Sequence, residues 1–137
     1  MNKNELYRHS LRIYSDDTDC YGIVWHPLYL SYMSKARVEW LRSLELEISV
    51  LKRQDTLLVV RSASVEYQQA ARLDDILEIT VKVAQLKKAS ASFEHTICRQ
   101  EDQVVIARGQ VRLACTSLAL KPRAWPAKLY EEMQRGS

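Results

Sequence analysis

The sequence predicts an α+β domain in which one long helix packs against a five-stranded antiparallel sheet. Two observations lead to this prediction: one segment has a long apolar stripe at helical spacing, and five segments alternate apolar with polar side chains. The order along the chain is strand, helix and then four strands, which suits an α+β layer rather than alternating βα units. We therefore treat residues 1–137 as one domain, long enough to bury most of its apolar surface.

The first two elements are a strand over residues 6–14 and a helix that opens at His26-Pro27 and runs to about Leu44. Proline suits the first helical position, because the N–H it lacks would be unpaired there anyway. The helix has one wide apolar stripe at three- and four-residue spacing. It consists of Tyr29, Tyr32, Met33, Ala36, Trp40, Leu41 and Leu44. Arg37, Glu39 and Arg42 lie off this stripe.

Four further strands and a short helix are predicted after a polar connection. The strands cover residues 57–68, 76–86, 89–99 and 103–118, and the helix covers 127–135. Short links join the last three strands, which predicts an antiparallel meander. In the first of the four, Val59 is expected on the same face as Val65, and Gly109 in the last predicts a bend or bulge. One helix cannot cover both faces of this sheet, so we expect an oligomer.

Composition and charge exclude several classes of protein. The net charge of +3 is too small to argue for nucleic-acid binding. No apolar run approaches the ~20 residues of a membrane span, and the first ten residues lack the apolar core of a signal peptide. Three widely spaced cysteines, Cys20, Cys98 and Cys115, fit neither a disulfide framework nor a zinc motif. We interpret them as reduced thiols of a cytoplasmic protein.

An acidic segment, DDTDCYGIVWHPLY at residues 16–29, joins the first strand to the helix. Asp16 and Asp17 suit turn and capping roles, because Asp accepts hydrogen bonds from nearby backbone N–H groups. Gly22 would allow a positive φ or a close approach of the backbone to a ligand. A calcium loop beginning at Asp17 would place Tyr21 and Leu28 where oxygen ligands are needed. We therefore predict neither a metal nor a cofactor.

The order of elements and this segment together resemble the hotdog fold of acyl-CoA thioesterases of the 4-hydroxybenzoyl-CoA thioesterase type. The likeness is closest to the YbgC-like branch associated with the Tol-Pal system, which has D-T-D-x-x-G-x-V-Y/W-H-x-x-Y and then A-R. Here this pattern is filled by Asp17-Thr18-Asp19, Gly22, Val24-Trp25-His26, Tyr29 and Ala36-Arg37. Further matches are VEY at 65–67, ARLDD at 71–75, ASASF at 89–93 and KPRAWP at 121–126. The resemblance covers nearly the whole chain.

The resemblance implies an assembly and a substrate. The fold would form a dimer whose sheets join, often pairing into a homotetramer, with an acyl-CoA substrate at the dimer interface. Contact with an acyl carrier protein is also implied. Gly22, Trp25, Lys88 and Ser90 would bind substrate, the last two beside the CoA portion.

Thioester hydrolysis needs a carboxylate that attacks the carbonyl or activates a water, and donors that meet the developing oxyanion. Asp19 lies seven residues before His26, at a helix start whose free N–H groups and dipole suit an oxyanion. The resemblance implies that Asp19 is the nucleophile or the general base, and that a backbone N–H near His26 polarises the carbonyl. His26 itself has three interpretations: a helix-entry residue with a satisfied ring, a residue that orients Asp19 or the water, or an acid–base partner.

Two departures from the branch pattern bear on the choice of base. Ser34 stands where many relatives carry a helix Glu, and Ser15 where many carry Tyr. Because the helix stripe offers no acid, Asp19 is the better candidate. The main hypothesis is hydrolysis of small to medium acyl-CoA thioesters. The alternatives are a hotdog dehydratase or hydratase, which would need a helix acid, and a non-catalytic acyl-thioester-binding or partner-scaffolding dimer.

Overall fold

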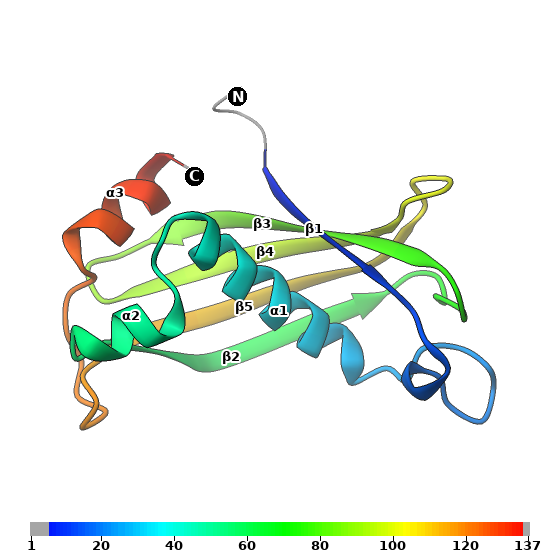
Figure 1. The fold of residues 1–137 in the computed structure, drawn as a ribbon, viewed down its shortest axis with the longest axis horizontal. Coiled ribbons are helices and arrows are strands. Elements are labelled where there is room, and N and C mark those ends of the chain that lie inside the picture. The colour runs from blue at the N-terminus through cyan, green and yellow to red at the C-terminus, as the bar shows by residue number, and fades with distance from the viewer. Residues whose placement is uncertain (1–5, 136–137) are drawn as a thin grey trace.

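A five-stranded antiparallel sheet forms the centre of the fold, with strand order β1-β3-β4-β5-β2 and a long helix lying across one face (Figure 1). The structure is a computed structural model that describes residues 6–135. Its elements are β1 (Tyr7–Arg12), the 3-10 helix η1 (Ser15–Asp17), α1 (Leu28–Ser43), α2 (Ile48–Arg53), β2 (Leu57–Tyr67), β3 (Ile76–Leu86), β4 (Ser90–Arg99), β5 (Val105–Thr116) and α3 (Ala127–Arg135). The predicted α+β class, the long helix and all five strands are confirmed; α2 was missed.

The apolar stripe of α1 packs on the sheet as the sequence predicts, but Gly109 has a different role from the one expected. Gly109 pairs in register with Val65 on β2 and His95 on β4, so the strand has no bulge at this point. A Cβ built at Gly109 would lie 2.5 Å from the thioether end of Met33, which is fully buried. The glycine therefore lets α1 approach the sheet closely.

Arg37 is buried, although it lies off the apolar stripe. It is only 8 % exposed, and its Nη1 lies 3.0 Å from Nε2 of His95. The other ring nitrogen of His95 lies 2.8 Å from the carbonyl oxygen of Thr80. A carbonyl only accepts, so Nδ1 carries the proton and Nε2 accepts from Arg37. Burial, with a smaller contribution from the Arg37 charge, lowers the pKa of His95 to about 4, and the ring is neutral.

A bulge between Val60 and Ser62 reverses which side chains of β2 face the helix. Val59 lies opposite Ala114 and Val65 lies opposite Gly109, so the two valines are on opposite faces of the sheet. Their predicted common face was wrong, because a bulge shifts the alternation by one residue.

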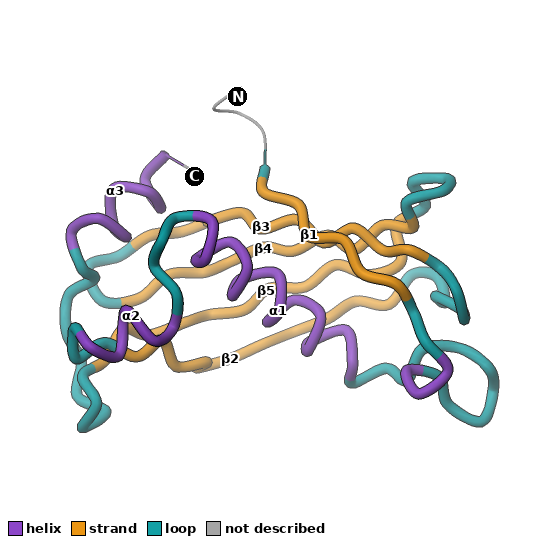
Figure 2. The backbone as a smooth tube through the Cα atoms, in the orientation of Figure 1, coloured by secondary structure: helices purple, strands orange, loops and turns teal. Residues whose placement is uncertain are grey.

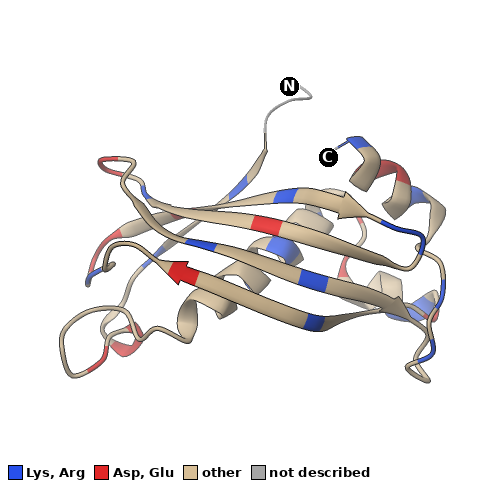
Figure 3. Cartoon of the chain, turned by 180° about the vertical axis from the view of Figure 1, so that it is seen from behind, with Lys and Arg blue, Asp and Glu red and all other residues tan. Residues whose placement is uncertain are grey.

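The face of the sheet away from α1 is polar and carries both signs of charge (Figure 3). Its exposed residues include Arg8, Lys82, Glu66, Arg108 and Arg112. This face needs no apolar cover, so the expected reason for an oligomer does not hold. The long exposed edge of β2, where no described strand pairs, is a better reason.

The end of the sheet near the β3–β4 hairpin is closed by α3. Trp125 is 6 % exposed; its backbone N–H bonds the carbonyl of Lys88, and its Nε1 donates to the carbonyl of Lys87 at 2.8 Å. Leu129 and Met133 of α3 are fully buried beside it. The three cysteines are free thiols. Within residues 6–135, no helix is long and apolar enough to cross a membrane.

Candidate active site

The acidic segment forms a loop folded back on itself at the start of α1 (Figure 2). Thr18 forms an antiparallel bridge with Val24. The Asp19 N–H bonds the Ile23 carbonyl at 2.9 Å, and the Trp25 N–H bonds the Asp17 carbonyl at 3.0 Å. We call residues 14–26 the acidic turn. Its backbone bonds fix the path of the chain into the helix.

The three acids of the turn differ in what they bond. Asp17 has the predicted capping role, because its Oδ2 accepts from the Tyr14 N–H at 2.8 Å. Asp16 is exposed. Asp19 also closes a turn, since its Oδ1 accepts from the Tyr21 N–H at 2.8 Å. In the part of the chain that the structure describes, Oδ2 of Asp19 accepts no hydrogen bond, so this oxygen is available for chemistry.

Gly22 has a φ of +78°, which confirms the positive φ predicted for it. A Cβ at this position would meet nothing within 4 Å, so the reason for glycine is the backbone conformation. The residue is exposed, as are Tyr21 and Trp25, which are 81 % and 52 % exposed.

His26 presents a free backbone N–H at the entrance to the helix. The flanking N–H groups are engaged: Trp25 donates to Asp17, Leu28 to the Trp25 carbonyl at 2.9 Å, and Tyr29 to the His26 carbonyl at 3.3 Å. Among residues 6–135, the His26 N–H has no acceptor. It is therefore the donor at this helix start that can meet a ligand oxygen.

The imidazole of His26 is exposed and packs between two aromatic rings. Its centroid lies 6.4 Å from that of Trp25 and 6.1 Å from that of Tyr67, both edge-on. Its ring nitrogens bond no group in the described part of the chain. Among the described residues no hydrogen bond joins the ring to Asp19, and the three interpretations of His26 stay open.

Three tyrosines, Tyr29, Tyr32 and Tyr67, lie beside the site, and none of them was predicted as a site residue. Tyr67 lies 5.6 Å from Tyr29, ring to ring, and its hydroxyl approaches the His26 carbonyl at 3.4 Å. The VEY match was the available signal for Tyr67. Tyr32 is 2 % exposed, and its hydroxyl has no hydrogen-bond partner among the described residues. Burial and the nearby Asp17 carboxylate raise the pKa of Tyr32, although the two groups do not reach hydrogen-bond geometry.

Lys88 and Ser90 do not join the acidic turn within one chain. They flank the start of β4, whereas the turn lies beside residues 71–75 at the opposite end of β3 (Figure 1). β3 has 11 residues, which at about 3.3 Å each separates the two places by roughly 35 Å. The structure therefore brings together Asp19, Gly22, Trp25 and His26, and leaves Lys88 and Ser90 apart.

The antiparallel sheet wrapped on one helix, with a carboxylate and a free N–H at the helix start, defines a hotdog-fold thioester hydrolase. A family model described as the thioesterase-like superfamily matches residues 15–133, and the chain belongs to this family.

The relatives and solved structures agree with this assignment. The chain is 34 % identical over 131 residues to the acyl-CoA thioester hydrolase YbgC of Escherichia coli, covering 95 % of this chain and 97 % of that protein. It is also 34 % identical over 121 residues to the acyl-CoA thioesterase YbgC of Haemophilus influenzae, covering 87 % and 88 %. A 1,4-dihydroxy-2-naphthoyl-CoA thioesterase from Synechocystis superposes with a TM-score of 0.87 at 22 % identity, covering 95 % of this chain and 96 % of that one. The predicted hotdog fold and YbgC-like branch are confirmed.

Proposed function

We propose that the protein hydrolyses small to medium acyl-CoA thioesters, with Asp19 as the group that starts the reaction. The observation that carries this proposal is the pairing of available groups on one turn: Oδ2 of Asp19 and the N–H of His26 bond nothing in residues 6–135. The two relatives at 34 % identity are named for acyl-CoA thioesters, which supports this substrate class.

Each group has a distinct role in the proposed reaction. The His26 N–H donates a hydrogen bond to the thioester oxygen as that oxygen becomes negative. Asp19 either attacks the carbonyl carbon, displacing the CoA thiolate to leave a mixed anhydride that water hydrolyses, or removes a proton from the water that attacks. The exposed ring of Trp25 contacts the substrate on one side, and Gly22, which has no side chain, lets the substrate approach the backbone of the turn. The unbonded His26 ring orients the water or shuttles a proton.

The proposal includes a dimer joined through the edges of two β2 strands. The exposed 11-residue edge of β2 offers unpaired backbone groups to a second copy. Lys88 and Ser90 lie about 35 Å from the acidic turn of their own chain, by the rise per residue of β3, so they would contact the CoA portion bound to another copy. Arg61, Ser90 and Arg112 line one cavity of about 390 Å³, a lining that suits phosphate groups. A cytoplasmic location, pairing into a tetramer and contact with an acyl carrier protein belong to the same proposal.

The experiment measures thiol release from a panel of acyl-CoAs by the native protein and by Asp19→Asn. Asparagine keeps the oxygen that accepts from the Tyr21 N–H, so the turn should fold. We expect the loss of the carboxylate to lower kcat by about a hundredfold or more. Asp16→Asn, a change of the same kind on an exposed acid of the same turn, is the control and should retain full activity.

Three outcomes have clear meanings. Loss of release in a folded Asp19→Asn variant, with Asp16→Asn active, supports the site and the activity. Release that survives Asp19→Asn would keep the activity and remove Asp19 from it. No release from the native protein with any acyl-CoA would overturn the proposed substrate class.

A further inference from the structure

Residues 70–75 hold the acidic turn at both of its ends. Before the turn, the Ile13 N–H bonds the Asp75 carbonyl at 2.8 Å, and the Asp74 N–H bonds the Ile13 carbonyl at 2.9 Å. Near the other end of the turn, the Val24 N–H bonds the Ala71 carbonyl at 2.9 Å. Residues 70–75 are named here the clasp segment. Any shift of this segment moves both arms of the loop that carries Asp19.

The clasp segment also contacts the acidic turn at Ile23 and the first turn of α1 at Tyr29. Ile23 forms an antiparallel bridge with Arg72, and the Ala71 N–H donates to the hydroxyl of Tyr29 at 3.2 Å. Tyr29 is in the first turn of the helix and is 3 % exposed. The clasp segment therefore contacts both the turn that carries Asp19 and the first turn of the helix that follows His26.

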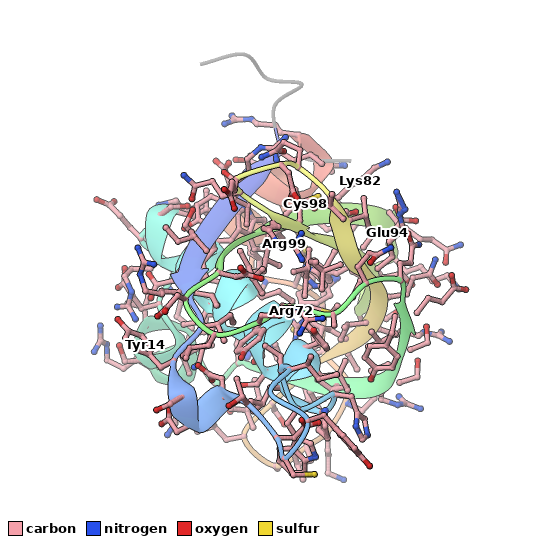
Figure 4. All side chains as sticks on the ribbon, turned by 90° about the vertical axis from the view of Figure 1, so that its right-hand side faces the viewer. Tyr14, Arg72, Lys82, Glu94, Cys98 and Arg99 are labelled. Carbon is pink, nitrogen blue, oxygen red and sulfur yellow. The ribbon has the colours of Figure 1, made fainter. Side chains whose placement is uncertain are left out.

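One side chain from the sheet holds the clasp segment in place. Arg99, the last residue of β4, lies at the same end of the molecule as Arg72 (Figure 4). Its Nη2 donates to the Ala70 carbonyl at 3.1 Å, and its Nε donates to Oδ2 of Asp75 at 3.1 Å. These two acceptors are the first and last residues of the clasp segment.

The carboxylate of Asp75 links Arg99 to the backbone of the clasp segment. The same Oδ2 that accepts from Arg99 also accepts from the Arg72 N–H at 2.9 Å. The Arg99 and Asp75 side chains are each only 19 % exposed, so solvent screens the pair less than a surface ion pair. A third bond, from Nη1 to Asp102 at 2.9 Å, fixes the plane of the guanidinium. Lysine could not reproduce this three-way fork, because an ammonium is a point donor.

We propose that Arg99 is a positioning residue for hydrolysis. It holds both ends of the clasp segment and so sets where the Asp19 carboxylate lies relative to the His26 N–H. This inference rests on the proposed function of Asp19. In this role Arg99 acts through the clasp segment and not on the substrate, so its removal should change kcat and leave KM nearly the same. A displacement of about 1 Å at a reacting group can cost as much as a hundredfold in rate.

The test compares Arg99→Ala with Arg123→Ala under saturating acyl-CoA. Arg123 makes a similar fork, with Nη1 bonding the carbonyls of Gln54 at 3.0 Å and Asp55 at 2.8 Å, but it lies at the α3 end of the sheet. We expect Arg99→Ala to lower kcat tenfold to a hundredfold with KM changed less than threefold, and Arg123→Ala to change kcat less than twofold. Added guanidinium at low millimolar concentration should restore part of the kcat of Arg99→Ala, and urea should not.

Hydrogen exchange gives a readout that does not depend on activity. The Val24 N–H, bonded to the clasp segment, should exchange faster in Arg99→Ala than in the native protein, and unchanged protection would overturn the proposal. A kcat of Arg99→Ala within twofold of the native value would also overturn the proposal. If Arg99→Ala does not fold, the same criterion applies to Arg99→Lys. If Asp19→Asn abolishes hydrolysis while the Arg99 variants are fully active, the proposed function stands and the positioning role is wrong.

Discussion

The two ends of the sheet differ in whether their polar groups are hydrogen-bonded within the fold. At the α3 end, both nitrogens of Trp125 bond backbone carbonyls, and Leu129 is fully buried beside them. At the acidic turn, three polar groups bond nothing within the described residues: Oδ2 of Asp19, the His26 N–H and the buried Tyr32 hydroxyl. A buried polar group without a partner lowers stability, and of these three groups only the Tyr32 hydroxyl is buried. The groups of the acidic turn are therefore available to a ligand, as the proposed site requires, whereas both nitrogens of Trp125 are engaged within the fold.

The largest effect that separates the two ends should come from Leu129→Ala. Removing a fully buried side chain from α3 should lower the free energy of unfolding by about 2–5 kcal/mol, while kcat of the folded enzyme is unchanged. Chemical denaturation and thiol release at a temperature where the variant is folded measure both quantities. Tyr21→Ala at the other end, where the side chain is 81 % exposed, should change stability by less than about 0.5 kcal/mol. A loss of kcat in Leu129→Ala would show that the ends are coupled.

His95, in the middle of the sheet, should make the free energy of unfolding depend on pH. Burial lowers the pKa of His95 in the folded state to about 4 from 6.5, so between these values the unfolded chain binds a proton that the folded chain does not. Stability should fall as the pH falls from about 6.5 to 4, by on the order of 3 kcal/mol, and this contribution should level off below pH 4. Denaturation midpoints across this range measure it. In His95→Gln, which can donate to Thr80 and accept from Arg37 without titrating, the dependence should weaken; an unchanged slope would assign it to other groups.

A smaller change in stability than that of Leu129→Ala is expected for Tyr32, near the acidic turn. Tyr32→Phe removes a buried hydroxyl that has no partner in residues 6–135, so the free energy of unfolding should rise by about 1 kcal/mol. Urea denaturation of the variant and the native protein measures the difference. Tyr29→Phe is the matched control, because its hydroxyl accepts from the Ala71 N–H and its loss should be destabilising. A less stable Tyr32→Phe would mean that the hydroxyl interacts favourably with Asp17.

The sequence predicted the elements well because their apolar periods are regular. The boundaries of β3 are those predicted, since Leu77, Ile79, Val81 and Val83 alternate without interruption. The bulge in β2 could not be read from the sequence, because no glycine or proline marks it. The burial of Arg37 could not be read from the sequence either, because the sequence does not show that His95, 58 residues away, offers a neutral acceptor under the helix.

Only the candidate site residues that lie close together in the sequence could be predicted. Asp19, Gly22 and His26 lie within eight residues, and the positive φ of Gly22 followed from its residue type. Tyr67 and Arg99 reach the same region through the sheet, by contacts that depend on strand order. Lys88 and Ser90 lie near the start of β4, beside the end of β3 that is away from the acidic turn. Distances across a sheet cannot be inferred from a motif.

The acidic turn is held mainly through main-chain hydrogen bonds, and this decides which of its positions tolerate substitution. Bonds from the backbone of Asp19, Val24 and Trp25 to other carbonyls shape it, and the side chains of Asp17 and Asp19 add to them, whereas Cys20, Tyr21 and Trp25 are exposed. Replacements at these three positions should leave the main-chain bonds intact. In the proposed site they would change what a ligand meets beside Asp19, so the acyl-group preference should respond to few substitutions without compensating changes in the core.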